Sequence, residues 1–463
     1  MPIDLMGHID PISLISLITP KQYPMSTSTT NESVFQLDAK IPFLKALPIG
    51  LQHVLAMFVA NITPIIILAN VLGLEQGLSA SLIQNAMIIA GIGTTIQLYP
   101  LWRIGSRMPI VMGISFTFLS VAIFVGTTYG TGAMAGAIIV GGIVEGLLGL
   151  FAKYWIRIIT PVVAATVVTA IGFSLLPVGA NSFAGGVGAA DFGSWQNWVV
   201  GTVTLVCCLG FNIFLKGYYK MISVLFGLIV GYILAVCMGM VDFSAVTATN
   251  KIVALPTILP FRPEFNWSAI LSFVVIFLVS ATETIGDTSA LAATGLKRQP
   301  TTKELSGAIA CDGLVSSVAG VFGCTPITSF SQNVGLVAMT GVVNRRAILT
   351  GALVMLVAGF IPGFGAILTT VPQCVLGGCT IMMFGSIIVA GIEMITRCGI
   401  EGRNKTIVIL SLAIGLGFTQ ASEMFNIFPE IIKSIFAENC VAVVFCLAVL
   451  LNLILPKDKE QEA

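Results

Sequence analysis

Long apolar runs follow one another along most of this chain and are separated by short polar or glycine-containing loops. A bilayer core requires about 20 predominantly apolar residues per helix, and fourteen candidate runs can be recognised. They cover 50–72, 79–100, 108–127, 131–152, 158–178, 195–215, 221–240, 268–290, 304–322, 327–342, 346–369, 372–395, 405–421 and 437–455. The pattern predicts an all-α membrane protein with fourteen transmembrane segments.

The third and tenth runs are short, and each begins near a proline. The segment 109–116 (PIVMGISF) can be aligned with 326–333 (PITSFSQN). The β-branched and hydroxyl residues of 326–331 favour an extended strand, and unpaired strand backbone cannot face lipid. We therefore expect two short strands that pair inside the protein. The half-helices after them would direct free N–H groups towards the membrane centre.

Fourteen segments divide into two sets of seven. An odd number in each half inverts the second half relative to the first, which is the plan of many secondary transporters. In such proteins, corresponding short or interrupted segments indicate a binding site near the bilayer midplane.

Composition agrees with a membrane protein, since 56% of the residues are hydrophobic and only 9% are charged, against about 25% charged in soluble domains. The net charge of +1 and the absence of a basic run give no indication of a nucleic-acid partner. The ten cysteines contain no CxxC pair, and neither an HExxH motif nor a glycine-rich phosphate loop is present. We expect neither a metal site nor an enzyme.

Basic residues predict the orientation, because cytoplasmic loops carry an excess of lysine and arginine. With both termini cytoplasmic, nineteen of the 22 basic residues fall on that side, and the exceptions are Lys251, Arg262 and Lys433. This distribution supports fourteen segments in a cell membrane, with cytoplasmic tails at 1–42 and 457–463.

Two carboxylates stand out in the eighth segment, because a carboxylate at mid-bilayer costs about 3 kcal/mol. Glu283 and Asp287 are four residues apart and share one helix face. Two close carboxylates in a low dielectric rarely both ionise, so we expect one to hold a proton. Asp287 could alternatively belong to a helix end that reaches water.

Other polar residues also occur inside apolar segments. Asp312 lies in the ninth segment and His53 in the first, where His53 is either a structural residue or a proton shuttle. Glu145 could be structural or lie against water, and no role is assigned to it. Amides and hydroxyls that both donate and accept suit a flat heterocycle, and the third and tenth segments supply Ser115, Thr117, Ser331, Gln332 and Asn333.

The stretch 332–341 (QNVGLVAMTG) matches every fixed position of the signature of the nucleobase–ascorbate transporter family. It occurs with Glu283 and Asp287 (ETIGD), with Asp312 before Gly313, and with His53 after Gln52. The chain thus resembles this family over roughly residues 43–456.

The resemblance implies two inverted repeats and two bundles. A core domain would comprise 43–157 and 268–369, and a gate domain would comprise 158–240 and 370–456. Members are typically homodimers in which the core shifts against the gate like an elevator.

The resemblance also implies roles for single residues. Glu283 and Gln332 would hydrogen-bond the ring edge of the ligand, and backbone amides near Phe116 and Ser331 would bind its carbonyl oxygens. Phe116 would stack on the ligand. Ser115, Asn333 and Gly335 would shape the site. Asp287, Asp312 and His53 would support the site or take part in proton coupling.

Gln332 at the first signature position indicates a purine, since uracil carriers of the family tend to have Glu there. Ser115 occupies a position where some xanthine carriers of the family have the larger Asn. The smaller Ser115 would leave room for the extra oxygen of uric acid. We expect proton-coupled symport of xanthine, with uric acid second, and no cofactor other than the coupling proton. The alternatives are uracil or another nucleobase, and an anion transporter of the same fold.

Overall fold

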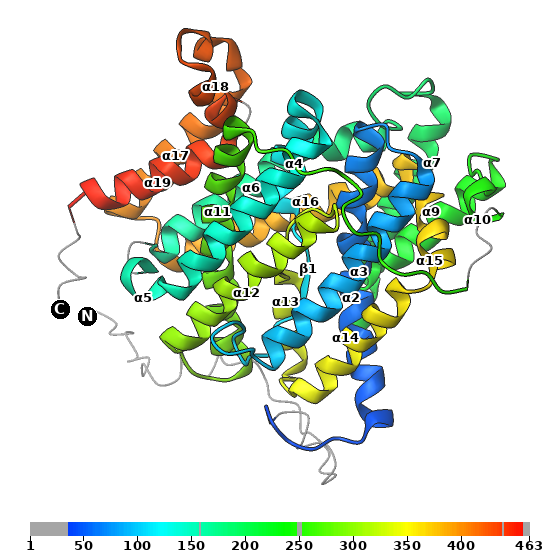
Figure 1. The fold of residues 1–463 in the computed structure, drawn as a ribbon, viewed down its shortest axis with the longest axis horizontal. Coiled ribbons are helices and arrows are strands. Elements are labelled where there is room, and N and C mark those ends of the chain that lie inside the picture. Colours follow the sequence, from blue (N-terminus) through cyan, green and yellow to red (C-terminus); the bar gives the residue numbers. More distant parts are fainter. Residues whose placement is uncertain (1–35, 157–158, 248–251, 438, 457–463) are drawn as a thin grey trace, which may run out of the picture.

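The computed structural model describes residues 36–456 except 157–158, 248–251 and 438, and this part of the chain is almost entirely helical (Figure 1). Most of the expected N-terminal tail and the whole of the C-terminal one, residues 1–35 and 457–463, lie outside the described residues. Residues 36–39 contact the start of α14 (Arg345–Gly359), where Asn344 Nδ2 donates hydrogen bonds to the carbonyl oxygens of Gln36 and Ala39 at 2.9 and 3.0 Å.

The described helices follow the apolar runs closely. In the first half they are α2 (Phe43–Val71), α3 (Gln76–Leu98), α4 (Leu119–Leu150), α5 (Ala152–Trp155), α6 (Pro161–Phe183), α7 (Trp195–Phe214), α8 (Tyr218–Met221), α9 (Ser223–Cys237) and α10 (Ser244–Thr247). In the second half they are α11 (Trp267–Gly295), α12 (Thr302–Val321), α13 (Ser331–Thr340), α14 (Arg345–Gly359), α15 (Pro362–Thr369), α16 (Gln373–Cys398), α17 (Gly402–Gln420), α18 (Glu430–Phe436) and α19 (Cys440–Ile454). The 3-10 helices η2 (Phe116–Phe118) and η4 (Ser422–Ile427) complete the set.

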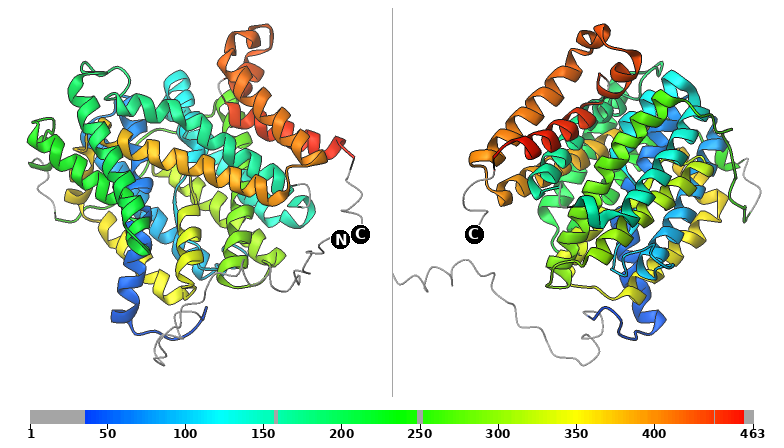
Figure 2. Two further views of the ribbon diagram at one scale, coloured as in Figure 1. Left: turned by 180° about the vertical axis from the view of Figure 1, so that it is seen from behind. Right: turned by 60° about the vertical axis from the view of Figure 1, so that its left-hand side comes forward.

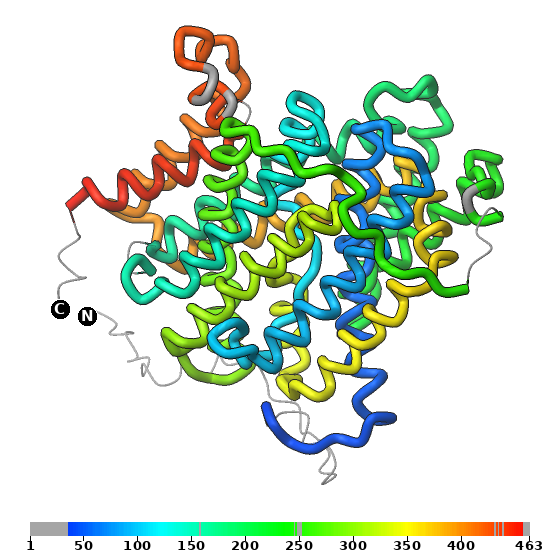
Figure 3. The backbone as a smooth tube through the Cα atoms, viewed as in Figure 1, coloured from blue at the N-terminus to red at the C-terminus, as the bar shows by residue number. Residues whose placement is uncertain are grey.

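By length and hydropathy, eight helices among the described residues can cross a membrane. The count becomes nine if α14 and α15, which meet at an angle of 82°, form one bent span. This bend is visible in the yellow part of the chain in Figure 3. The apolar helices α9 and α19 are shorter. The protein is therefore a multi-pass membrane protein, while the total of fourteen segments stays a prediction.

A glycine separates the predicted third and fourth segments. Gly130 lies within the bounds of α4 but has φ 89° and ψ 164°, which are not helical angles, so α4 consists of two helices that meet at a kink there. Glycine adopts positive φ without the clash that a Cβ would cause. The chain can therefore turn at Gly130, between the two apolar runs.

Two short strands lie at the centre of the molecule, as the sequence predicts (Figure 1). Strand β1 (Met112–Ile114) pairs antiparallel with β2 (Ile327–Ser329), and Met112 lies opposite Ser329. Beyond the strands, Ser115 N donates to Pro326 O at 3.1 Å and Phe330 N to Val111 O at 2.9 Å. These bonds satisfy backbone groups of both segments within the protein, as a lipid environment demands.

The helices pack in two groups. Around the strands, α4 packs against α11 and α12, while α14 packs against α2 and α3. In the second group, α6 packs against α16, α7 packs against α9, and α17 packs against α19. Figure 2 shows α17 and α19, in orange and red, together at one edge of the molecule.

Glycines allow α4 and α12 to approach closely. A Cβ on Gly313 would lie 2.2 Å from Gly146 N, and one on Gly142 would lie 2.6 Å from Gly313 O. Small residues at helix crossings favour tight packing in membranes. The α4–α12 contact is therefore a backbone-to-backbone one.

Candidate functional site

The two carboxylates of α11 each contact a different half-helix. Glu283 Oε2 accepts a hydrogen bond of 2.7 Å from Thr117 Oγ1, just after β1. One turn later, Asp287 Oδ2 accepts a hydrogen bond of 2.7 Å from Ser331 Oγ, at the first residue of α13. Both carboxylates are half-buried. The shared helix face predicted for them thus faces the starts of both half-helices.

Asp312 on α12 holds β2 in place. Its Oδ2 accepts hydrogen bonds from the backbone N and the Oγ of Ser329, both at 2.9 Å, and from Thr284 Oγ1 at 2.7 Å. Its Oδ1 accepts one of 2.9 Å from Gln97 Nε2 of α3. The Asp312 side chain is fully buried, so these four bonds replace the water that a carboxylate otherwise needs. Through these hydrogen bonds, Asp312 fixes β2 and with it the start of α13.

Strand β1 is held by side chains of two other helices. Thr94 Oγ1 of α3 accepts a hydrogen bond of 2.9 Å from Met112 N, and Asn61 Oδ1 of α2 accepts one of 2.7 Å from Ile114 N. On β2, Ser316 Oγ of α12 accepts one of 3.1 Å from Ile327 N. The backbone that positions both half-helices is therefore anchored by polar side chains on three helices.

The start of α13 offers free donors. The N-cap residue Phe330 provides no side-chain cap, and the first N–H groups of a helix lack the usual partner within it. Asn333 N donates to Phe330 O at 3.0 Å, which leaves the N–H groups of Ser331 and Gln332 without a partner in the described part of the chain. Asn333 is buried and donates from Nδ2 to the carbonyl oxygen of His53 at 3.4 Å. The His53 ring is also buried, and its Nδ1 has no hydrogen-bond partner in the described part of the chain.

A cavity of about 250 Å³ lies between α2 and α13 on one side and α8, α9 and α16 on the other. Gln332 and Gly335 line it, together with Lys220, Met383 and Ser386. A Cβ on Gly335 would meet only Met221 Cε, at 3.8 Å. Gly335 therefore keeps this wall open.

Other predicted residues lie beside the cavity but do not line it. Phe116 is buried, and its ring meets the Phe384 ring of α16 edge-on at a centroid distance of 5.2 Å. Ser115 Oγ accepts a hydrogen bond of 3.3 Å from Thr117 N. Glu283 and Ser331 are also absent from the lining. The expected site residues thus fall into two adjacent groups: Gln332 and Gly335 line the cavity, and the residues around Glu283 lie beside it.

The alternative in which Glu145 lies against water is wrong. Its side chain is fully buried where α4 crosses α12, with its backbone carbon 2.7 Å from the position that a Gly313 Cβ would take. Neither carboxylate oxygen has a hydrogen-bond partner among the described residues. Close packing of the two helices, which the glycines permit, keeps water away from it.

Comparison with known proteins identifies the family. Residues 44–424 match the Xan_ur_permease model, which describes a permease family. The chain belongs to this nucleobase–ascorbate transporter family. The permease is 35% identical to the xanthine permease XanQ of Escherichia coli (strain K12), over 93% of this chain and 96% of that protein. It is 33% identical to a xanthine permease of Bacillus subtilis (strain 168), over 91% and 97% of the two chains. The protein is thus a transporter and not an enzyme.

Solved structures show the same fold in more distant proteins. The transmembrane domain of the cyanobacterial bicarbonate transporter BicA matches with a TM-score of 0.57 and 16% identity, over 90% of the permease and 98% of that chain. The murine anion transporter Slc26a9 in its inward-facing state matches with a TM-score of 0.59 and 11% identity, over 98% and 76%. These similarities extend to the fold alone.

Sequence reasoning missed the residues that hold the strands, namely Asn61, Thr94, Gln97, Thr284, Ser316 and Ser329. Their common signal is a polar side chain inside an apolar segment, and each is buried or joined to a buried partner. Thr284 is the residue among them that the sequence could most easily have indicated, because it follows Glu283 directly. Its hydroxyl donates to Asp312.

Proposed function

We infer that this permease is a proton-coupled symporter that imports an oxidised purine, with xanthine as the first candidate and uric acid as the second. The observation that carries the proposal is the contact of Glu283 and Asp287 with the starts of the two half-helices. Carboxylates and free helix N–H groups thereby meet in one place. A neutral ring that bears both N–H donors and carbonyl acceptors needs this combination.

Recognition would use both kinds of group. Thr117 engages Oε2 of Glu283, which leaves Oε1 for a ring N–H. Gln332, which lines the cavity, can donate and accept in one plane. Backbone N–H groups near Phe116 and Ser331 would bind the ring carbonyls, and Phe116 would stack on the ring. Ser115, Asn333 and Gly335 would shape the site.

Coupling would use the second carboxylate. Asp287 accepts its hydrogen bond from Ser331, at the start of α13. A proton on Asp287 would weaken that acceptor, so protonation and the position of the half-helix would be linked. Asp312 would hold β2, and His53 would support α13 through Asn333. No cofactor besides the proton is required.

The architecture proposed for this function has fourteen segments in two inverted repeats. Support comes from the packing, because α4 with α11 and α12 corresponds to α14 with α2 and α3. Aligning 109–116 with 326–333 also makes Met112 equivalent to Ser329, and these two residues face each other in the ladder.

Residues 43–157 and 268–369 would form the core, and 158–240 and 370–456 the gate. We propose a homodimer in the cell membrane with both termini cytoplasmic. The cavity that reaches Lys220 would then open towards the cytoplasm.

An anion transporter is the second candidate, because the fold is shared with bicarbonate and anion transporters. Glu283 and Asp287 beside the half-helix starts argue against it, since like charges repel. The family relatives named as xanthine permeases favour a purine over uracil or another nucleobase.

Uptake of radiolabelled xanthine and uric acid by a bacterium without purine permeases tests the proposal. We expect accumulation that a protonophore abolishes and that excess unlabelled xanthine suppresses. Uracil and bicarbonate should not compete. Accumulation that survives the protonophore would contradict the proposed proton coupling. Failure to take up either purine would contradict the proposed substrate.

A further inference from the structure

A second, larger cleft lies at the end of the molecule where the loop between α3 and β1 meets the C-terminal end of α4 and the start of α12. Its volume is about 1180 Å³, and five basic side chains line it: Arg103, Arg107, Lys153, Lys303 and Arg345. We refer to it as the basic cleft. The carboxylates of the candidate substrate site do not line it.

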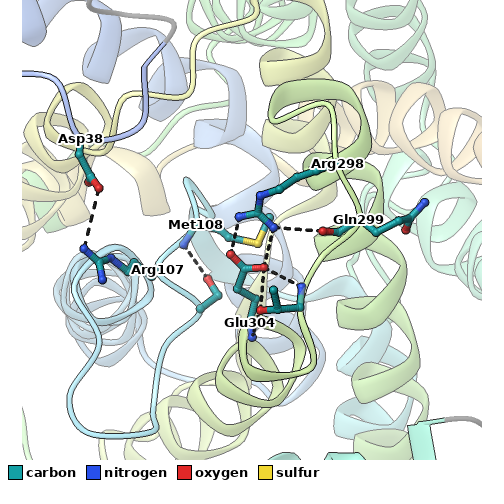
Figure 4. A network of polar contacts seen from close by, with 8 residues as sticks. Asp38, Arg107, Met108, Arg298, Gln299 and Glu304 are labelled. Carbon is teal, nitrogen blue, oxygen red and sulfur yellow. Dashed lines mark hydrogen bonds and ion pairs between the residues drawn. The ribbon is translucent and has the colours of Figure 1, made fainter.

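Acidic groups neutralise only part of this charge. Asp38 pairs with Arg345 and lies 3.8 Å from Arg107 Nη2. Glu304, which also lines the cleft, is already paired with Arg298 at 2.6 Å, as Figure 4 shows beside the Asp38–Arg107 pair. The other three cations, Arg103, Lys153 and Lys303, form no ion pair within the described part of the chain.

Two further observations indicate a binding site rather than an ordinary charged surface. The side chain of Arg345 is only 7% exposed, and its buried Nε has no hydrogen-bond partner among the described residues, so part of this cation at the wall of the cleft is left without a counter-group. The loop also holds Trp102 and Arg107 at φ 56° and 62°. Positive φ is costly for such residues, and such strain clusters at ligand clamps.

The rim of the basic cleft, which we define as Trp102 of its lining and the exposed residues adjacent in the chain to lining residues, has the composition of a membrane–water interface. Trp102 and Tyr154 are 80% and 78% exposed, and Leu101 and Phe151 are also exposed. Arg103 lies over the Trp102 ring at 5.7 Å. Exposed aromatic rings mark the headgroup level of a bilayer, and basic pockets between membrane helices bind anionic headgroups.

We propose that the basic cleft binds the phosphodiester headgroup of an anionic phospholipid, such as phosphatidylglycerol. Arg103, Lys153 and Lys303 contact the phosphate, Arg345 contributes its buried charge to the wall of the cleft, and Trp102 lies against the glycerol and the upper acyl chain. A soluble phosphate would satisfy the cations but would leave the apolar rim in water.

The bound headgroup would stabilise the fold around β2. Ser106 N donates to Gln97 Oε1 at 3.0 Å, and Arg107 N donates to Gln97 O at 2.9 Å. Gln97 in turn donates to Asp312. A lipid that holds this loop therefore also steadies the side chain that binds Ser329.

Thermal unfolding of the purified full-length protein in detergent tests the binding. Dioctanoyl phosphatidylglycerol at about 100-fold above its Kd should raise Tm by about 3 °C or more. Dioctanoyl phosphatidylcholine and glycerol 3-phosphate should not. The double variant R103Q/K153Q should lose the shift. The control K216Q/K405Q, which changes two exposed lysines outside the cleft, should keep it.

Quenching by brominated phosphatidylglycerol supplies a second measurement, which reports contact with the lipid rather than thermal unfolding. Trp102→Phe should remove a saturable part of the quenching, and unlabelled phosphatidylglycerol should compete for that part. An equal Tm shift with glycerol 3-phosphate would make the ligand a soluble phosphate and overturn the lipid proposal. Equal shifts with phosphatidylcholine, equal loss in the control variant, or unchanged quenching in Trp102→Phe would also overturn it. None of these outcomes depends on the transported substrate.

Discussion

The hydroxyl of Ser331 donates a hydrogen bond of 2.7 Å to Asp287, which ties the first residue of α13 to α11. One turn earlier on α11, Glu283 makes the equivalent contact with Thr117 beyond β1. One face of α11 therefore contacts the starts of both half-helices. Movement of either half-helix relative to α11 must break one of these bonds or carry α11 with it.

Glu283→Gln should lower xanthine uptake by at least about 10-fold, because hydrogen bonds to a charged group contribute about 1.5–3 kcal/mol. Membrane expression should stay near normal, since the amide oxygen can still accept from Thr117. The matched control is Glu393→Gln on α16, an exposed residue 3.8 Å from Arg397. Initial uptake rates normalised to the amount of protein provide the measurement. Wild-type transport by Glu283→Gln would exclude the residue from recognition.

Asp287→Asn should separate binding from accumulation. An amide does not take up the coupling proton, so we expect xanthine exchange to persist while accumulation against a concentration gradient is lost. A variant that still accumulates xanthine in a protonophore-sensitive way would show that another group carries the proton.

Ser331→Ala should lower uptake by about 10-fold or more, because a hydrogen bond to a charged group contributes about 1.5–3 kcal/mol. Ser81→Ala is the control, since the Ser81 hydroxyl is exposed and bonds within its own helix. If both serine variants behaved alike, the contact between Ser331 and Asp287 would have no part in transport.

Asp312→Asn should destabilise the protein. The new amide group would face the donors of Gln97, Thr284 and Ser329 and could not accept all four hydrogen bonds, at a cost of about 3 kcal/mol. Thermal denaturation in detergent should show a lower Tm, accompanied by loss of uptake. Asp242→Asn, in an exposed loop where Asp242 bonds Ser244, should leave Tm nearly unchanged. An unchanged Tm in Asp312→Asn would contradict the anchoring role.

Gly313→Ala should also lower Tm, since the added methyl group would lie 2.2 Å from the backbone nitrogen of Gly146 and backbone cannot move aside cheaply. Overpacking of this kind costs about 1–3 kcal/mol. Gly417→Ala on α17 meets nothing within 4 Å, so it should be neutral or stabilising by up to about 1 kcal/mol. Equal stability of the two variants would mean that α4 and α12 can separate without loss.

Local sequence patterns predicted most of the helices and the two strands, but not the bend between α14 and α15 inside the apolar run 346–369. Apolar runs mark helices because lipid imposes their length, and the β-branched and hydroxyl residues at 326–331 indicated β2 before any partner was known. The four-residue spacing of Glu283 and Asp287 also predicted their common face, because helix periodicity is a local property.

Contacts between distant segments could not be predicted in this way. Gln97 and Asp312 are 215 residues apart, and nothing in their own neighbourhoods indicates that they meet. Thr284 resembles a threonine that bonds its own helix, until the fold brings Asp312 beside it. The cavity wall formed by Lys220 and Ser386 depends on how two helix groups pack.

The pairing of β1 with β2 restricts how this region can change over evolution. Backbone hydrogen bonds such as that from Phe330 N to Val111 O hold the ladder together, so opposed side chains such as those of Ile114 and Ile327 can vary while the ladder survives. Inserting or deleting one residue would shift the register and turn every side chain to the opposite face. It would also displace Thr117 or Ser331 from its carboxylate. Homologues should therefore differ here by substitution, with the length of both segments unchanged.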